Sequence, residues 1–223
     1  MAGPLSGIRV LDFTWALAGP YGVMILADLG AEVWKIEAAH QNETRRGSGP
    51  YVHGVSTYFF SVNRGKKSLG LDLTTPDGLD ILMKLAATCD VFLTNKLPGV
   101  REKLGIGVDA IREANPNIIY VRGTGQGERG LEADLGFGYE KMSAINPRLV
   151  YASTSGFGHT GPYRQRGAVD AIVQGMGGVM SMTGHVGGMP ARAGYSIGDM
   201  GGGMYTAIGV LSALVERDRS GLG

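Results

Sequence analysis

The regular alternation of short apolar runs with helix-like segments is the feature that most restricts the fold of this 223-residue chain. Strands are expected at 8–13, 31–37, 68–73 and 90–95, and helices at 18–30 and 74–89. Such alternation is typical of parallel strands joined by helical crossovers, which place helices on both faces of a sheet. The sequence therefore predicts an α/β fold over 1–223, a single Rossmann-like domain with an open, mainly parallel sheet and helices on both faces.

Two parts of the chain are expected to lie at one edge of this sheet. The loop after Phe13 and the residue Asn95 each follow a predicted strand, and the carboxyl ends of parallel strands meet at a common edge where ligands bind. Between about His40 and Lys67 the pattern is irregular and polar. We interpret that segment as a long loop over a site.

A repeat interrupts the alternation in the middle of the chain. The segment 104–127 is echoed 31 residues later by 135–158, with eight of 24 aligned positions identical. Each copy is predicted to form a helix, a turn and a strand. A solenoid needs about three or more repeats, so we favour a local duplication or a junction between two related chains. Only one copy can occupy a given place in a sheet, and the other is expected to add an edge strand or to pack poorly.

Composition excludes several classes of function. Lys and Arg number 21 against 20 Asp and Glu, so no general attraction for nucleic acid or an anionic membrane is expected. The single Cys89 cannot form an internal disulfide, and no metal-ligand spacing links it to the four histidines. The apolar run 207–215 is far shorter than the ~20 residues of a membrane span, and no signal-like segment begins the sequence. We expect a cytoplasmic protein that needs no metal.

Common nucleotide and hydrolase motifs receive little support. Gly125, Gly127 and Gly130 match the dinucleotide pattern G-x-G-x-x-G after a strand, but the following sequence is no clean helix, which argues against NAD or FAD. No P-loop and no G-x-S-x-G elbow is present. Basic residues gather in three clusters, and each cluster is either ordinary surface or a site for a polyphosphate such as coenzyme A (CoA) or a nucleotide. The clusters are Arg45 with Arg46; Arg64 with Lys66 and Lys67; and Lys96 with Arg101 and Lys103.

Asp199 stands directly ahead of an apolar helical run, in the sequence GDMGGGM. An Asp at this place can be a helix N-cap. However, Gly201, Gly202 and Gly203 cost helix stability, about 0.5–1 kcal/mol each relative to Ala, and close approach of the backbone to a ligand is one reason for them. A carboxylate at a helix amino terminus is kept ionised by the dipole, and nearby N–H groups can stabilise an oxyanion. The pattern therefore also fits a nucleophilic carboxylate.

Five blocks in order along nearly the whole chain resemble the amino-terminal half of the class III (CaiB/BaiF-type) CoA-transferases, a family that includes formyl-CoA transferase and carnitine CoA-transferase. The blocks are 4–37, 63–78, 95–105, 145–163 and 194–221. The resemblance implies a Rossmann-like large domain, interlocked homodimers and CoA as a substrate. It also implies that Asp199 attacks an acyl-CoA thioester and that an aspartyl-CoA thioester then receives an acceptor carboxylic acid.

The resemblance further implies where CoA binds. The loop after the first strand points to Ala16, Leu17 and Ala18, and the later segments that follow a strand and begin a helix point to Asn95, Lys96, Lys103 and Leu104. Alpha-methylacyl-CoA racemase is a relative that needs a His before an Asp, but Val169 precedes Asp170 here. Family chains are about twice as long, and the repeat is not a family feature. The alternatives are therefore a racemase-like enzyme, or an inactive, truncated CoA-binding chain.

Overall fold

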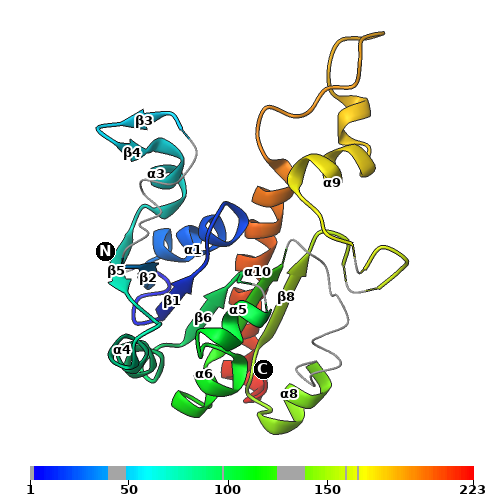
Figure 1. Ribbon diagram of the computed structural model, residues 1–223. Helices are drawn as coiled ribbons and strands as arrows, with labels where there is room; N and C mark the ends of the chain where they lie inside the picture. Colours follow the sequence, from blue (N-terminus) through cyan, green and yellow to red (C-terminus); the bar gives the residue numbers. More distant parts are fainter. Residues whose placement is uncertain (1–2, 40–48, 97, 125–138, 159, 165) are drawn as a thin grey trace.

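The computed structural model describes residues 3–39, 49–96, 98–124, 139–158, 160–164 and 166–223. Strands and helices alternate along most of the chain, as Figure 1 shows. The strands are β1 (Arg9–Phe13), β2 (Glu32–Ala38), β3 (Tyr51–Val52), β4 (Val55–Ser56), β5 (Lys66–Leu71), β6 (Val91–Thr94), β7 (Ile119–Thr124) and β8 (Tyr151–Ser155). The helices are α1 (Ala18–Asp28), α3 (Thr57–Asn63), α4 (Pro76–Ala86), α5 (Pro98–Lys103), α6 (Val108–Ala114), α8 (Tyr139–Ile145), α9 (Asp170–Met176), the 3-10 helix η1 (Val179–Met182) and α10 (Ile197–Ser220).

Six strands form one sheet in the order β5-β2-β1-β6-β7-β8, and every neighbouring pair is parallel. Successive side chains of a strand point to opposite faces, so Val10 and Leu11 of β1 belong to two different apolar clusters. α1 and α10 cover the Val10 face, whereas α4 and α6 cover the Leu11 face. This arrangement confirms the predicted Rossmann-like sheet with helices on both faces.

The segment predicted to be a long loop contains regular structure, so that prediction is wrong for its described part, 49–67. β3 and β4 form a hairpin, and α3 follows directly, with Ser56 as N-cap accepting a hydrogen bond from the amide of Phe59 at 3.2 Å. His53 and Gly54 form the turn with positive φ angles of 50° and 77°. Strands of two residues are too short for a periodic pattern, which explains why the sequence did not indicate them.

Both copies of the repeat contribute a helix and a strand to the fold. α6 and β7 come from the first copy, α8 and β8 from the second, and β8 forms the edge of the sheet beside β7. Tyr120 pairs with Tyr151, the residue at the same position of the other copy. The pattern G-x-G-x-x-G at 125–130 lies outside the described residues.

Glycines allow α1 and α10 to pack with their backbones in close contact. A Cβ on Gly203 would lie 2.6 Å from the carbonyl oxygen of Ala18, and one on Gly22 would lie 2.8 Å from that of Gly203. Both distances are shorter than any normal contact to a side chain. Gly203 therefore serves helix packing, which corrects the interpretation that the glycines after Asp199 are there for a ligand.

Two alanine substitutions on α10 should change stability in opposite directions. Gly203→Ala should lower the free energy of unfolding by about 1–3 kcal/mol, because the methyl group overpacks the contact with α1. Gly201→Ala should raise it by up to about 1 kcal/mol, because a Cβ at Gly201 meets no atom within 4 Å and Ala favours a helix. Chemical denaturation measures both. Equal effects of the two substitutions would contradict the close contact between α1 and α10.

Candidate active site

A pocket of about 770 Å³ opens at the carboxyl edge of the sheet. The ends of β1, β2 and β5 form its floor, and α3 contributes one wall. In parallel α/β sheets this edge is where ligands bind. The lining residues are Phe13, Thr14, Trp15, Ala16, Ile36, Glu37, Ala38, Ala39, Tyr58, Phe59, Val62, Asn63, Leu71, Asp72, Leu73, Thr74, Lys96, Val100 and Leu104.

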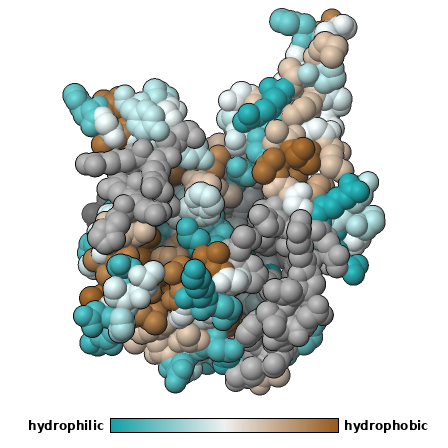
Figure 2. Space-filling view, viewed as in Figure 1, coloured by the Kyte–Doolittle hydropathy of each residue, from teal (hydrophilic) through white to brown (hydrophobic). Residues whose placement is uncertain are grey.

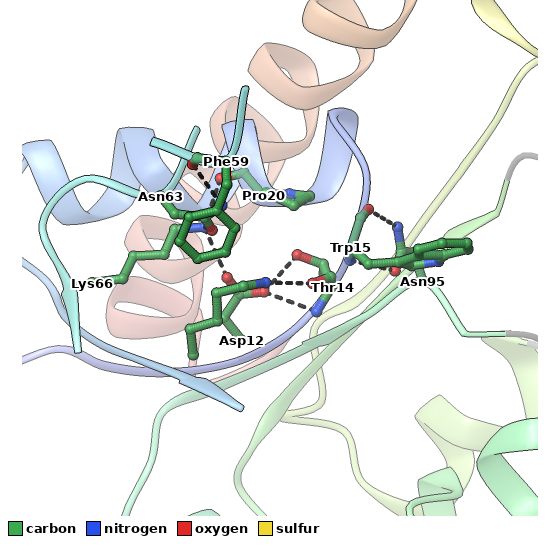
Figure 3. Close-up of polar contacts among 9 residues, drawn as sticks. Asp12, Thr14, Trp15, Pro20, Phe59, Asn63, Lys66 and Asn95 are labelled. Carbon is green, nitrogen blue, oxygen red and sulfur yellow. Dashed lines mark hydrogen bonds and ion pairs between the residues drawn. The ribbon is translucent and has the colours of Figure 1, made fainter. Parts of the chain in front are cut away.

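A buried ion pair joins β5 to β1 beneath the pocket. The Lys66 Nζ lies 2.8 Å from the Asp12 Oδ2, and the two side chains are 1% and 0% exposed. Figure 3 shows that Lys66 also donates to the carbonyl oxygen of Pro20 and to the side chain of Asn63, both at 2.9 Å. One ammonium group therefore connects β1, the start of α1 and α3, and two of these elements, β1 and α3, contribute residues to the pocket lining.

The charge state of Asp12 depends on two lysines. Burial alone would raise the pKa of Asp12, but the nearby Lys66 and Lys35 and the hydrogen bonds from Lys66 and Thr14 hold this pKa below its ordinary value. Lys35 is itself buried and donates to the carbonyl oxygen of Thr14 at 2.7 Å. Asp12 is thus an ionised structural group beneath the pocket.

Asn95 fixes the loop that follows β1. Its side-chain amide donates to the carbonyl oxygen of Trp15 at 2.7 Å and accepts from the amide of Trp15 at 2.9 Å (Figure 3). The next residue, Ala16, has a φ of +66°, a left-handed conformation that costs an Ala about 1–2 kcal/mol. Because Ala16 lines the pocket, the two bonds from Asn95 hold a strained part of the pocket wall.

Asn95→Ala should lower the free energy of unfolding by about 1–2 kcal/mol, because two hydrogen bonds worth about 1 kcal/mol each are lost. The loop at Ala16 should then relax. Asn117→Ala is the control, since Asn117 is exposed and its side chain makes no hydrogen bond among the described residues. Urea denaturation of the two variants checks this, and equal stabilities would contradict the role of Asn95.

The three basic clusters have different surroundings. Lys66 is buried in its ion pair with Asp12, whereas Arg64 and Lys67 are exposed and pair with Asp28 and Glu32. These acidic partners lie more than 30 residues away in the sequence, so the pairs could not be predicted from spacing.

Lys96 is the basic residue that lines the pocket. Its Nζ lies 5.0 Å from the ring centre of Trp15 and 5.6 Å from that of Phe13. The ammonium group thus stands over two aromatic rings at the pocket. Arg101 is buried at 4% exposure, and Arg45 and Arg46 lie outside the described residues.

Asp199 lies in the first turn of α10, three residues after Ser196, which occupies the N-cap position. The N-cap interpretation of Asp199 is therefore wrong. Asp170 on α9 accepts a hydrogen bond from the amide of Gly198 at 2.9 Å, and its other oxygen accepts from Gln174 at 2.7 Å. A Cβ on Gly198 would lie 2.7 Å from Val173, so glycine before Asp199 is needed where α9 meets α10.

The pKa of Asp199 is raised above its ordinary value, by burial first and then by the negative charge of Asp170, while Arg192 opposes the shift. This direction is opposite to the one expected from the helix dipole alone. The pKa of Tyr58 is also raised, by burial and then by Asp199. Tyr58 lines the pocket, so the charge of Asp199 acts on one residue of the pocket wall.

The residues expected to form the site are only partly brought together. Ala16, Lys96 and Leu104 line the pocket, and Asn95 shapes it through Trp15. Three other expected residues do not line it: Leu17 and Ala18 lie at the start of α1, and Lys103 is exposed at the end of α5. Asp199 does not line the pocket, although its charge acts on Tyr58, which does.

Sequence reasoning missed the pocket residues on α3 and at the end of β2. Tyr58 and Phe59 were in the segment assigned to a loop, and Glu37 was placed in a strand without a role. The position of Glu37 at the carboxyl end of a predicted strand was a usable signal. No signal in the sequence pointed to Asp170, whose side chain accepts a hydrogen bond from the amide of Gly198. Sequence reasoning considered only that Val169, and not a His, precedes it.

Two negative findings concern the described residues. Among them, no three His, Cys, Asp or Glu side chains are grouped so as to hold a metal ion. No helix in that part of the chain is long and apolar enough to cross a membrane.

Comparisons with known proteins give one consistent result. The chain is 38% identical to the mouse succinyl-CoA:glutarate CoA-transferase over 99% of its own length and 44% of the relative. It is 40% identical to the acetyl-CoA:oxalate CoA-transferase of Acetobacter aceti, over 99% of this chain and 49% of that protein. The chain thus spans about half the length of the curated relatives it matches.

A solved structure agrees with these relatives. The crystal structure of a CAIB/BAIF family protein from Brucella suis superposes on all of this chain and on 52% of its own, with a TM-score of 0.77 and 32% identity. The model of the CoA-transferase family III matches residues 5–135 and 132–223. The two matched segments together cover nearly the whole sequence, and the chain belongs to CoA-transferase family III.

Proposed function

We propose that this chain carries the CoA-binding and nucleophilic part of an enzyme that moves CoA between an acyl-CoA and a carboxylic acid. The observation that carries the proposal is the half-buried Asp199 in the first turn of α10, whose charge raises the pKa of Tyr58, a residue that lines the pocket. Family membership supports the reaction class, since the relatives compared above are named CoA-transferases. The donor and acceptor acids are left open.

The proposed reaction passes through two kinds of acyl intermediate on Asp199. The Asp199 carboxylate attacks the thioester carbonyl, and CoA thiolate leaves as a mixed anhydride forms. The thiolate then attacks the aspartyl carbonyl of this anhydride, the donor acid leaves, and an aspartyl-CoA thioester remains. The acceptor carboxylate attacks that thioester, which releases CoA thiolate and forms a second mixed anhydride. The thiolate then attacks the acceptor carbonyl of this anhydride, which gives the new acyl-CoA and frees the Asp199 carboxylate.

The described residues support this proposal in three ways. Burial and Asp170 raise the pKa of Asp199, which makes its carboxylate a more basic nucleophile when ionised. The amino end of α10, where the helix dipole is positive, favours developing negative charge. Lys96, with the loop at Ala16 and the residue Leu104, offers CoA a positively charged pocket wall.

We further expect the enzyme to work in the cytoplasm as a homodimer, without nucleic acid, membrane or metal. Large apolar side chains are exposed in the segment 179–189, which begins with η1, and on the outer face of α10. Figure 2 shows apolar residues at the surface near α9. Met182, Val186 and Met189 are 81%, 108% and 86% exposed, and Tyr205 and Ile208 are 77% and 54% exposed. Such a surface is typical of one covered by another subunit.

Trapping of the acyl intermediate tests the proposed function. The protein is incubated with several acyl-CoA thioesters and hydroxylamine, and its peptides are analysed by mass spectrometry. A hydroxamate should form on Asp199 and not on Asp218, an exposed carboxylate of the same helix. Exchange of a substrate proton in deuterated water without any hydroxamate would favour the racemase-like alternative. CoA binding with neither reaction would indicate an inactive CoA-binding chain.

A further inference from the structure

The backbone before Asp199 sets the position of its carboxylate. Among the described residues, no group donates a hydrogen bond to this carboxylate. Ser196, at the N-cap position, makes no side-chain bond to the first turn of α10. The close contact of Gly203 with Ala18 fixes α10 only one turn later. What places the carboxylate is therefore whatever holds the backbone at 193–198.

Gln174 on α9 makes three hydrogen bonds to this region, and its side chain is buried at 1% exposure. Its amide nitrogen donates to the Asp170 Oδ2 at 2.7 Å and to the carbonyl oxygen of Tyr195 at 3.3 Å. Its amide oxygen accepts from the backbone amide of Ala193 at 2.9 Å. A carboxylate and a carbonyl only accept, and a backbone N–H only donates, so a single orientation of the Gln174 amide satisfies all three groups.

These bonds join points that are far apart along the chain. Between α9 and α10 the chain extends away from the sheet and then returns, as Figure 1 shows. Ala193 and Tyr195 lie 19 and 21 residues after Gln174, where the chain returns to α10. The Tyr195 side chain is 55% exposed, so its packing contributes little to holding this segment. Gln174 thus closes the base of the excursion directly before Asp199.

Gln174 also orients the group that caps α10. One oxygen of the buried Asp170 accepts the bond from Gln174, and the other accepts from the amide of Gly198 at 2.9 Å. This amide belongs to the first turn, where N–H groups have no partner within the helix. A side chain of α9 therefore supplies the cap that Ser196 does not supply. The bond from Gln174 fixes the direction of the Asp170 carboxylate and, through it, the residue before Asp199.

Resting on the proposed function, we infer that Gln174 is a positioning residue that holds the Asp199 carboxylate where it can attack a thioester. A neutral amide suits this role, because it bonds donors and acceptors together without adding a charge beside Asp170. A misplacement of about 1 Å in a reacting group can lower a rate about 100-fold. Loss of the Gln174 amide should therefore slow the attack by Asp199. Thioester binding should be unaffected, since Gln174 does not line the pocket.

Hydroxylamine trapping on the full chain, with acetyl-CoA and succinyl-CoA as probes, tests this inference. Gln174→Met keeps the length of the side chain and removes all three bonds. At saturating thioester, the rate of hydroxamate formation on Asp199 should fall about 10–100-fold. The thioester concentration that gives half of the maximal rate should stay within about twofold. This split separates a positioning role from a role in substrate binding.

Asn115→Leu is the matched control. The Asn115 amide also donates to two carbonyl oxygens, those of Ala86 and Cys89, and accepts from the amide of Asn117. It precedes β7 and so lies at the opposite edge of the sheet from the pocket. This variant should lose stability but keep the full trapping rate. An unchanged rate in Gln174→Met that thermal unfolding shows to be folded, or an equal fall in both variants, would overturn the inference.

Hydrogen exchange in the unaltered protein gives a second measurement that needs no variant. After correction for intrinsic rates, the amides of Ala193 and Gly198 should exchange at least about 100-fold more slowly than that of Gly194. The Gly194 amide makes no hydrogen bond among the described residues. Equal exchange at the three amides would overturn the inference even if Gln174→Met did not fold. Slow exchange without any hydroxamate in the unaltered protein would instead overturn the proposed function, and the positioning role with it.

Discussion

Asp199→Asn should leave the chain folded and unable to form any covalent intermediate, with turnover lowered by about 10⁴-fold or more. The amide keeps the size of the side chain but cannot attack a thioester, and no other carboxylate occupies the first turn of α10. Hydroxylamine trapping with mass spectrometry, together with circular dichroism of the variant, measures both parts of this expectation. Asp218→Asn, at an exposed position of the same helix, should form the hydroxamate on Asp199 to the same extent as the unaltered protein.

The raised pKa of Asp199 gives this prediction a pH dependence. Trapping should increase as the pH rises through the pKa of Asp199, which lies above that of an ordinary Asp. Asp170→Asn keeps an acceptor for the amide of Gly198 and removes the charge that raises this pKa, so the profile should move to lower pH. The positive charge of Arg192 opposes the rise in the pKa of Asp199, and the Asp199 charge in turn raises the pKa of Tyr58. A profile unmoved by Asp170→Asn would contradict the coupling of the two carboxylates.

The stability of the protein should respond in the opposite sense. A carboxyl whose pKa is higher in the folded than in the unfolded state contributes stability at low pH, and this contribution is lost as the pH rises through the folded-state pKa. At a pH above this raised pKa, Asp199 is ionised at a cost to folding. Asp199→Asn should therefore unfold at a somewhat higher temperature than the unaltered protein, although it is inactive.

The sequence predicted the sheet well because its central strands, β1 and β6, are buried on both faces. Val91, Phe92 and Leu93 of β6 form a continuous apolar run, which is typical of a central parallel strand. The edge at which the loop after Phe13 meets Asn95 was also predictable from strand order alone. The structure adds the two hydrogen bonds to Trp15, which no spacing could indicate across 80 residues.

The pocket was harder to predict because contacts between distant segments create it. Lys66 belongs to a basic cluster in the sequence, yet its partner Asp12 lies 54 residues away and both are buried. Tyr58 was missed because α3 has only seven residues and follows a very short hairpin. The glycines after Asp199 were misread in part, since the contact of Gly203 with Ala18 depends on how α10 packs on α1.

Lys66→Met should lower the free energy of unfolding by about 3–5 kcal/mol. The substitution preserves the apolar part of the side chain and removes the ammonium group. Asp12 then remains buried without the ammonium group that pairs with it. The carbonyl oxygen of Pro20 and the side chain of Asn63 each lose a hydrogen-bond donor. Chemical denaturation measures the effect. Lys84→Met removes an exposed ion pair with Asp80 and should leave stability nearly unchanged.

The pH dependence of the same two proteins separates a lost ion pair from simple loss of packing. The folded-state pKa of Asp12 lies below its ordinary value of about 3.9, so its stabilising contribution is complete above that pH and disappears as the pH falls towards the folded-state pKa. Without Lys66 this pKa should rise, because burial then dominates. Lys66→Met should therefore lose much of the acid sensitivity that Asp12 gives the unaltered protein, and Asp12→Asn added to it should restore part of the stability. A parallel fall of both stability curves with pH would show that Asp12 and Lys66 do not act as an ion pair.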